Sequence, residues 1–167
     1  MVKFQFLSQR QSSAYDYDSN NNSLVMVGGE VCTGTIWCNE YSNKTLITND
    51  GGESFEELAP FPALLKGHCA VFLDSNTLMV IGGYKPFDTV DNTYFLDQAS
   101  NVWTAGPPLT YARAYHTCNI ITDCDGKRQV VVVAGYSTGV AIPLIQTVEI
   151  YDVDSQTWSL GKSDHFY

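Results

Sequence analysis

An apolar run that ends in glycine occurs three times in this chain, and it constrains the fold more than any other feature. The runs precede glycines at three places: Gly28 and Gly29, Gly82 and Gly83, and Gly135, which follows Ala134. The second glycines of the three copies are 54 and 52 residues apart. A period of about fifty residues indicates a repeat architecture, in which each unit stacks on its neighbours to bury its faces.

Other landmarks recur around the glycines. Trp103 and Trp158 follow the second and third copies and are 55 residues apart, and a histidine precedes each of these copies, His68 and His116. The first unit has Phe55 at the tryptophan position and Ala14 at the histidine position, and Leu96 stands where the third unit has Tyr151. Because these landmarks recur in one order, the units are expected to share one structure.

This order of landmarks resembles the kelch repeat, in which a glycine pair is followed by a tyrosine and then a tryptophan. The resemblance covers nearly the whole chain and implies an all-β fold, a partial β-propeller of about three four-stranded kelch-type blades. The blades are expected at about 8–62, 63–110 and 111–163 of a single repeat region, 1–167. The long loops at 30–41, 85–91 and 137–146 are expected to be irregular, and an additional strand is expected at 2–7.

The repeat landmarks are expected to serve packing. A glycine after a β-branched run marks a close backbone approach, and a large aromatic buries on the order of 150–250 Å² between stacked sheets. His68 and His116, at equivalent positions, are expected to be structural as well. The repeat residues in this group are Gly28, Gly29, Phe55, Gly82, Gly83, Trp103, Gly135, Tyr151 and Trp158.

The segment 48–55 contains Thr48, Asp50, Gly52, Ser54 and Phe55 at nearly alternate positions. It is similar to the Asp box of sialidase-type propellers, which implies a self-hydrogen-bonded hairpin with its aromatic tucked inward. The box is a folding device, so it predicts a propeller hairpin without predicting sialidase activity.

The charge balance argues against nucleic acid and anionic membranes as partners. The chain has 18 acidic and 9 basic residues, a net charge of −9. Binding to phosphates or to anionic lipids depends on Lys and Arg. No apolar run approaches the roughly 20 residues of a membrane helix.

Five cysteines leave the compartment open. Cys32 and Cys38 share a loop and could close it as a disulfide. Cys118 and Cys124 are unsuited to each other, because an extended strand would separate them by roughly 20 Å, whereas a disulfide requires Cα atoms within about 7 Å. We see no secretion signal, which favours a cytoplasmic location, with an extracellular one as the alternative if a signal has been lost.

The segments after the glycines and between the blades hold the candidate binding residues. In kelch propellers these segments emerge on one face, where partners dock. Aromatic and arginine side chains dominate binding energy at protein interfaces. The expected partner-binding residues are Trp37, Lys85, Phe87, Tyr111, Arg113 and Tyr136.

We therefore expect a protein-interaction module and not an enzyme, with no metal or cofactor. The chain lacks the spacings of zinc-binding histidines and cysteines, a nucleophile elbow and a phosphate-binding glycine loop. Kelch domains act as scaffolds and as substrate adaptors in larger assemblies. The alternative is a fragment of an extracellular propeller that binds carbohydrate or resembles galactose oxidase or sialidase.

Three units are too few to close a ring, since propellers typically have 4–8 blades. The terminal units retain apolar strands where a stable array would have polar caps. We expect either that the chain is a piece of a longer kelch protein, which we favour here, or that two identical chains pair head to tail to complete the propeller.

Overall fold

The computed structural model describes residues 10–32, 38–139 and 144–161. Every regular element in these ranges is a β-strand, as the sequence predicts. In the same ranges, no helix has the length and apolar character that a membrane crossing requires.

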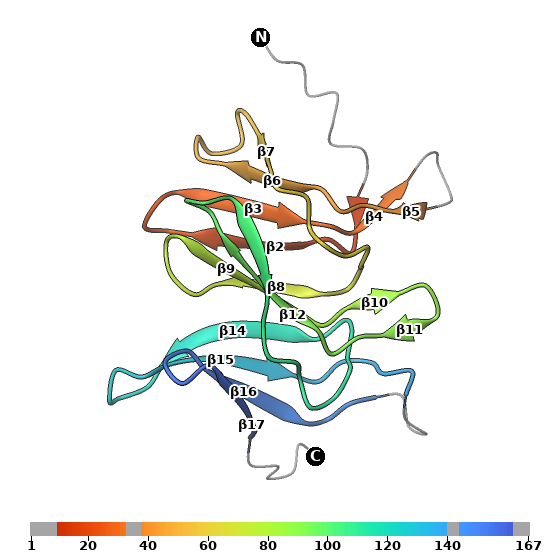
Figure 1. Ribbon diagram of the computed structural model, residues 1–167, viewed down its shortest axis with the longest axis vertical. Coiled ribbons are helices and arrows are strands. Elements are labelled where there is room, and N and C mark those ends of the chain that lie inside the picture. The colour runs from red at the N-terminus through yellow and green to blue at the C-terminus, as the bar shows by residue number, and fades with distance from the viewer. Residues whose placement is uncertain (1–9, 33–37, 140–143, 162–167) are drawn as a thin grey trace.

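Three four-stranded antiparallel sheets, which we call blades 1, 2 and 3, follow one another along the chain (Figure 1). Blade 1 has the order β2-β3-β6-β7, from strands Ala14–Asp18, Ser23–Val27, Thr45–Thr48 and Glu56–Leu58. Blade 2 has the order β8-β9-β12-β13, from Cys69–Phe72, Thr77–Ile81, Thr93–Asp97 and Val102–Ala105. Blade 3 has the order β14-β15-β16-β17, from Thr117–Thr122, Arg128–Val133, Val148–Asp152 and Thr157–Leu160.

Two small sheets lie at one end of the blades, on the right of Figure 1. One is β1-β4-β5, from Arg10–Gln11, Glu30–Cys32 and Cys38–Tyr41, and the other is the hairpin of β10 and β11, Tyr84–Lys85 and Asp88–Thr89. The loops predicted as irregular at 30–41 and 85–91 therefore contain short strands. The strand predicted at 2–7 lies outside the described residues.

The blades meet through their first strands, because β8 contacts both β2 and β14. Successive residues of a strand point to opposite faces of a sheet, so each blade has two packing faces. One core lies between blades 1 and 2 and includes Val25, Val27, Leu78 and Val80. A second core lies between blades 2 and 3 and includes Met79, Ile81, Val130, Val132 and Tyr151. Blade 2 is thus covered on both faces.

The two repeat tryptophans, Trp103 and Trp158, each tie a blade to the linker that precedes it. The indole N–H of Trp103 donates to the carbonyl of Ala59 at 3.0 Å, and that of Trp158 donates to the carbonyl of Pro107 at 3.0 Å. A buried indole needs such an acceptor. The repeat position therefore combines apolar packing with one fixed hydrogen bond to the chain between blades.

One left-handed residue per blade forms a backbone ladder between blades. Ser12, Gly67 and Tyr115 have φ values of 55°, 62° and 56°. The N–H of Gly67 donates to the carbonyl of Ser12 at 2.9 Å, and the N–H of Tyr115 donates to the carbonyl of Gly67 at 2.7 Å. The ladder shows that these three positions are equivalent, which places Ser13 at the histidine position. The prediction of Ala14 at that position is wrong by one residue.

A disulfide joins Cys69 of β8 to Cys118 of β14 and so links blade 2 to blade 3. Sequence analysis did not predict this pair, although the 49 residues between them come close to the repeat period. Cys124 is exposed and free. The β4–β5 register places Cys32 opposite Cys38, and the side chain of Cys38 is outside the described part of the structure.

The hairpin that resembles an Asp box has its own hydrogen-bond network. Asp50 accepts from the Thr48 hydroxyl at 2.7 Å, from the Ser54 hydroxyl at 2.6 Å and from the Ser54 N–H at 3.0 Å. The N–H of Gly52 donates to Thr48 Oγ1 at 3.0 Å. Phe55 is half-buried directly before β7. These bonds, from Ser54 first and then Thr48, hold the pKa of Asp50 well below its usual range.

We expect Asp50→Ala to lower the thermal midpoint at pH 7 and to have less effect in acid. The lowered folded-state pKa means that the carboxylate stabilises the fold above the ordinary aspartate pKa of about 4. That contribution is lost as the pH falls through the folded-state value. Thermal melts between pH 7 and pH 2 test this, with exposed Glu53→Ala in the same turn as control. Equal midpoints for the two variants at pH 7 would contradict the assignment.

Candidate functional site

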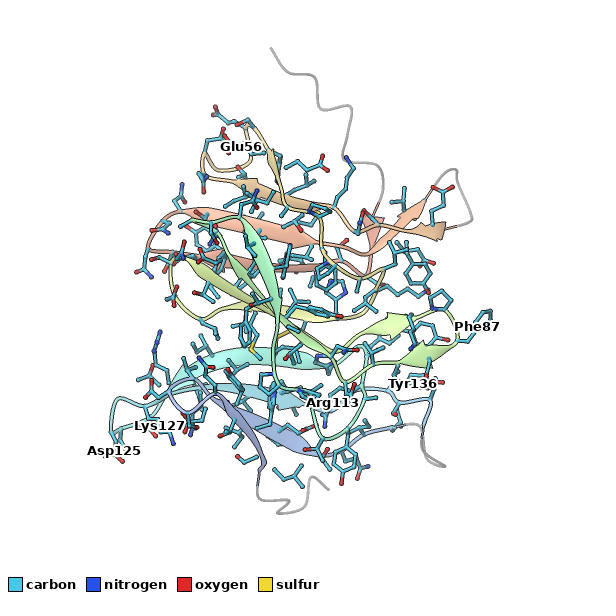
Figure 2. The ribbon with its side chains drawn as sticks, viewed as in Figure 1. Glu56, Phe87, Arg113, Asp125, Lys127 and Tyr136 are labelled. Atoms are coloured by element: carbon cyan, nitrogen blue, oxygen red, sulfur yellow. A yellow bond between two sulfur atoms is a disulfide. The ribbon has the colours of Figure 1, made fainter. Side chains whose placement is uncertain are left out.

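Phe87 is the most exposed large apolar side chain among the described residues, at 92%. It stands at the tip of the β10–β11 hairpin with a φ of 78°. A positive φ is costly for a residue with a Cβ atom, so the turn holds a large aromatic where glycine would fit more easily. Figure 2 shows Phe87 projecting from the same end of the blades as Tyr136, away from Asp125 and Lys127. We call this end the loop face.

The hairpin that carries Phe87 is fixed to the next blade. The N–H of Thr89 donates to Thr138 Oγ1 at 3.0 Å, and the N–H of Thr138 donates to Thr89 Oγ1 at 3.2 Å. The Thr138 hydroxyl also donates to Asp88 Oδ1 at 2.5 Å. These reciprocal bonds join the loops of blades 2 and 3 into one surface, and they hold Phe87 and Tyr136 on it.

The predicted partner-binding residues divide into three groups. Lys85 and Phe87 are exposed on the hairpin, and Tyr111 and Tyr136 are exposed at 38% and 36%. Trp37 lies outside the described residues. Arg113 is fully buried.

The prediction that Arg113 presents its side chain to a partner is therefore wrong. Its guanidinium donates to Glu149 Oε1 at 2.8 Å, and both side chains are 0% exposed. It also donates to the carbonyls of Ala134 and Thr147 at 2.9 and 3.0 Å. Burial lowers the pKa of Arg113, against the opposing effect of Glu149. This arginine therefore fixes the blade 3 loops from beneath the loop face.

Glu149 is the matching acceptor for the linker between blades 2 and 3. It accepts from the N–H of Thr110 at 2.6 Å and from the N–H of Tyr111 at 3.2 Å. The linker that presents Tyr111 is thus tied to β16 through a buried carboxylate. The sequence offered no indication of this, because no motif surrounds Glu149.

Sequence reasoning also missed a lysine on the loop face. Lys66 Nζ lies 3.1 Å from both carboxylate oxygens of Glu30, and 5.5 and 5.9 Å from the ring centroids of Tyr41 and Tyr84. Burial would lower the pKa of Lys66, but the hydrogen bond to Glu30 and the nearby charges raise it overall. In the sequence, the only indication was that Lys66 directly precedes Gly67 and the repeat histidine His68. The rings of Tyr41 and Tyr84 therefore lie beside an ion pair on the loop face.

The two repeat histidines lie inside the packing between blades. His68 Nε2 lies 3.1 Å from the carbonyl of Val27 in the preceding blade. Burial lowers the pKa of His68 to about 4, and burial together with the charge of Arg113 lowers that of His116 to about 3. Both rings are therefore neutral near pH 7. No three His, Cys, Asp or Glu side chains gather as a metal site in the described ranges.

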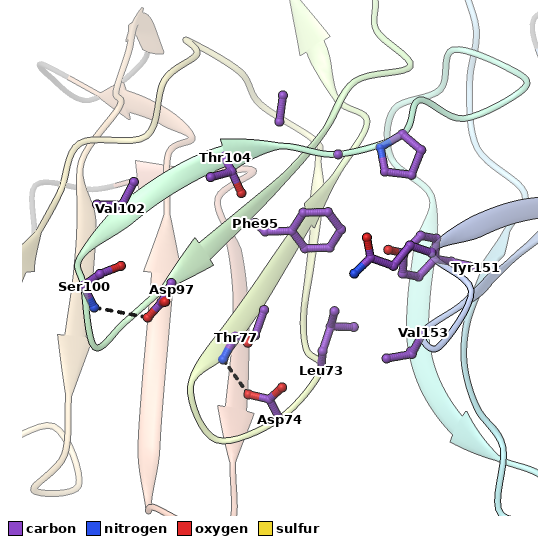
Figure 3. Close-up of a pocket in the computed structure, with 14 residues that line it drawn as sticks. Leu73, Asp74, Thr77, Phe95, Asp97, Ser100, Val102, Thr104, Tyr151 and Val153 are labelled. Atoms are coloured by element: carbon purple, nitrogen blue, oxygen red, sulfur yellow. Dashed lines mark hydrogen bonds between the residues drawn. The ribbon is translucent and has the colours of Figure 1, made fainter.

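A groove of about 530 Å³ opens between blades 2 and 3 (Figure 3). Phe95 and Tyr151 lie on its floor with ring centroids 6.1 Å apart. Asp74 and Asp97, at its edge, accept hydrogen bonds from the N–H groups of Thr77 and Ser100 within their own turns. These two carboxylates therefore stabilise the turns at the edge of the groove.

Comparisons with known proteins support the fold. No family model matches the chain, and no curated protein matches it. Among solved structures, the structure of YjhT, which has a propeller fold, matches with a TM-score of 0.71 and 14% identity. The match covers 95% of this chain and 53% of that one, so the chain spans about half the length of YjhT. The fold prediction is confirmed: the chain is all-β and forms a partial β-propeller of three four-stranded blades.

Proposed function

We propose that this chain is a kelch-type propeller segment that binds a protein partner through its loop face, as scaffold and adaptor domains do. The observation that carries the proposal is Phe87, held 92% exposed on a hairpin that is fixed to the neighbouring blade. Aromatic side chains held rigidly at a surface lose little conformational entropy on binding. Lys85 and Tyr136 lie on the same face and supply a charge and a second aromatic.

The proposal includes binding without catalysis. Four buried ionisable groups, Arg113, Glu149, His68 and His116, all contact the packing between blades or the loops above it. Catalytic acids and bases instead require a perturbed pKa in a cleft that a substrate can enter. The proposed role of the loop face therefore rests on contact surface and not on proton transfer.

We expect Phe87→Ala to weaken partner binding by about 30-fold, the effect of removing a hot-spot aromatic of ~2 kcal/mol. Its stability should change by no more than about 0.5 kcal/mol, because the side chain is exposed. The partner would be identified by affinity capture with mass spectrometry, and its affinity measured by calorimetry.

The matched control is Val102→Ala, which removes an exposed apolar side chain from the outer strand β13. This variant should bind as the parent does. If Phe87→Ala also binds with full affinity, the loop face is not the binding surface. Capture of glycans and of no protein would instead favour the carbohydrate-binding alternative.

A further inference from the structure

The outer faces of blades 1 and 3 have the composition of a propeller core but are not covered by the described residues. On blade 3, Val130 and Val132 pack on blade 2, so Val131 and Val133 point away from it, next to Val148 and Ile150. We call these four outward residues the β14–β16 face. Its members are only half-buried.

The register shows what this face is equivalent to. Val131 and Val133 occupy the positions that Val25 and Val27 have in blade 1, where both side chains are 0% exposed against blade 2. In blade 2, Met79 and Ile81 occupy the same two strand positions and are 0% exposed against blade 3. The β14–β16 face of blade 3 is therefore equivalent to the faces of blades 1 and 2 that pack on the following blade.

Blade 1 presents the opposite side. Val25 and Val27 face blade 2, so their strand neighbours Leu24 and Met26 point outward. Tyr15 and Tyr17 of β2 lie beside them and are 70% and 54% exposed. We call Tyr15, Tyr17, Leu24, Met26 and Leu46 the β2–β6 face. The equivalent residues of blades 2 and 3, such as Leu78 and Val130, are 0% exposed against the preceding blade.

Two residues that differ from the repeat pattern, Ala134 in blade 3 and Ser13 in blade 1, make these two faces complementary. A Cβ atom at Gly28 would lie 2.9 Å from Cε1 of His68, and one at Gly82 would lie 2.8 Å from Cε1 of His116. In blade 3 the equivalent residue is Ala134, at a φ of 61°, and it carries that Cβ atom. A histidine on the next blade would collide with it, so blade 3 requires a smaller residue there.

Blade 1 has that smaller residue. Ser13 faces Gly29 as His68 faces Gly83 and His116 faces Gly135. It is the one member of this set that is not a histidine, and it stands on the blade whose preceding side no described residue covers. If blade 1 packs on blade 3, the small side chain of Ser13 therefore leaves room for the Cβ atom of Ala134.

The backbone hydrogen bonds between blades continue in the same way. The N–H of Gly29 donates to the carbonyl of Leu65, and that of Gly83 to the carbonyl of Arg113, at 3.0 and 2.8 Å. The equivalent donor in blade 3 is Gly135, and the equivalent acceptor ahead of blade 1 is the carbonyl of Arg10. Docking of blade 1 on blade 3 would bring this donor and this acceptor together.

We propose that a second copy of this chain docks head to tail, with the β2–β6 face of each copy on the β14–β16 face of the other. Three blades of each copy then form a closed ring of six, within the usual 4–8. Such a head-to-tail contact gives a finite dimer because the rotation closes. The match also covers 53% of YjhT, about half of that chain. This inference uses faces separate from Phe87 and does not depend on the proposed loop-face function.

Light scattering coupled to size exclusion tests the proposal directly. At about 50 µM the chain should elute with twice the 18.5 kDa mass of one copy. A monomer would overturn the proposal, and so would a series of larger open oligomers, since closed pairing ends at two copies.

A compensating pair of substitutions tests the specific contact. Ser13→His should raise the dimer dissociation constant by at least about tenfold, because overpacking a contact between blades is destabilising. Adding Ala134→Gly should restore dimerisation. The double variant would have a glycine facing a histidine, as Gly28 faces His68 and Gly82 faces His116 in the other contacts between blades. Dimerisation of Ser13→His at parental affinity, or no rescue in a folded double variant, would overturn the contact.

A second pair of variants keeps the test valid if Ser13→His fails to fold. Val131→Lys places a charge on the β14–β16 face and should give a folded monomer by thermal melting and light scattering. Val102→Lys places the same charge on exposed β13 and should remain a dimer. A dimer from Val131→Lys would overturn the proposal.

Discussion

Glu149→Ala is expected to destabilise the folded chain by about 3–5 kcal/mol, the typical effect of removing one partner of a buried ion pair. Arg113 and Glu149 are both fully buried and lie 2.8 Å apart. Alanine at 149 would leave the guanidinium without its counter-charge. It would also remove the acceptor for the N–H groups of Thr110 and Tyr111.

Urea unfolding at pH 7 measures this effect. Glu57→Ala is the matched control, because its pair with Lys44 is about half exposed at 49% and 52%, and exposed pairs contribute about 0–1 kcal/mol. If both variants change the free energy of unfolding equally, the Arg113–Glu149 pair does not hold blade 3 together as described.

Replacing both Cys69 and Cys118 with alanine is expected to lower the free energy of unfolding by about 4 kcal/mol in the chain-entropy model for a loop of this length. The disulfide spans 49 residues and joins the first strands of two blades, so it restricts the unfolded chain across nearly one whole repeat. Urea unfolding of the double variant under non-reducing conditions measures the change.

Cys124→Ser is the control for this variant, because Cys124 is exposed and free. It should change stability by no more than about 0.5 kcal/mol. Peptide mapping without reductant should recover Cys69 linked to Cys118. Recovery of Cys118 linked to Cys124 would contradict the assignment of the pair.

The disulfide also bears on the compartment. Sequence analysis favoured the cytoplasm on the basis of the N-terminal segment. Structural disulfides form and persist in oxidising compartments and are rare in the cytosol. Because Cys32 is also disulfide-bonded, we propose that the chain folds in the secretory pathway or an equivalent oxidising compartment.

The strands of the blades could be predicted closely from the sequence. The apolar runs before the glycines are the second strands of the blades, which end at Val27, Ile81 and Val133. The small strands β4, β5, β10 and β11 were not predicted. They contain 2–4 residues each, too few for an alternating pattern to stand out, and they form because the loops pair on the end of the blades.

The loop face was harder to predict than the fold, because contacts between blades are not visible along one repeat. Arg113 was assigned to the surface from its residue type and its place in a linker. Its burial depends on Glu149, which lies 36 residues later on β16. Lys66 was overlooked for the same reason, since Glu30 and the two tyrosines beside it come from other strands. The exposure of Phe87, at the tip of a turn, depends on no such partner, so it could be predicted from the sequence.

Hydrogen–deuterium exchange on the chain, with and without its captured partner, tests the central claim most directly. On binding, we expect protection in the β10–β11 hairpin and in residues 136–139, which both lie on the loop face. The turns at 19–22, 74–76 and 123–127 connect the first two strands of each blade at the other end of the blades, and their exchange should not change. Protection confined to these turns, with none around Phe87, would contradict the assignment of the loop face as the binding surface.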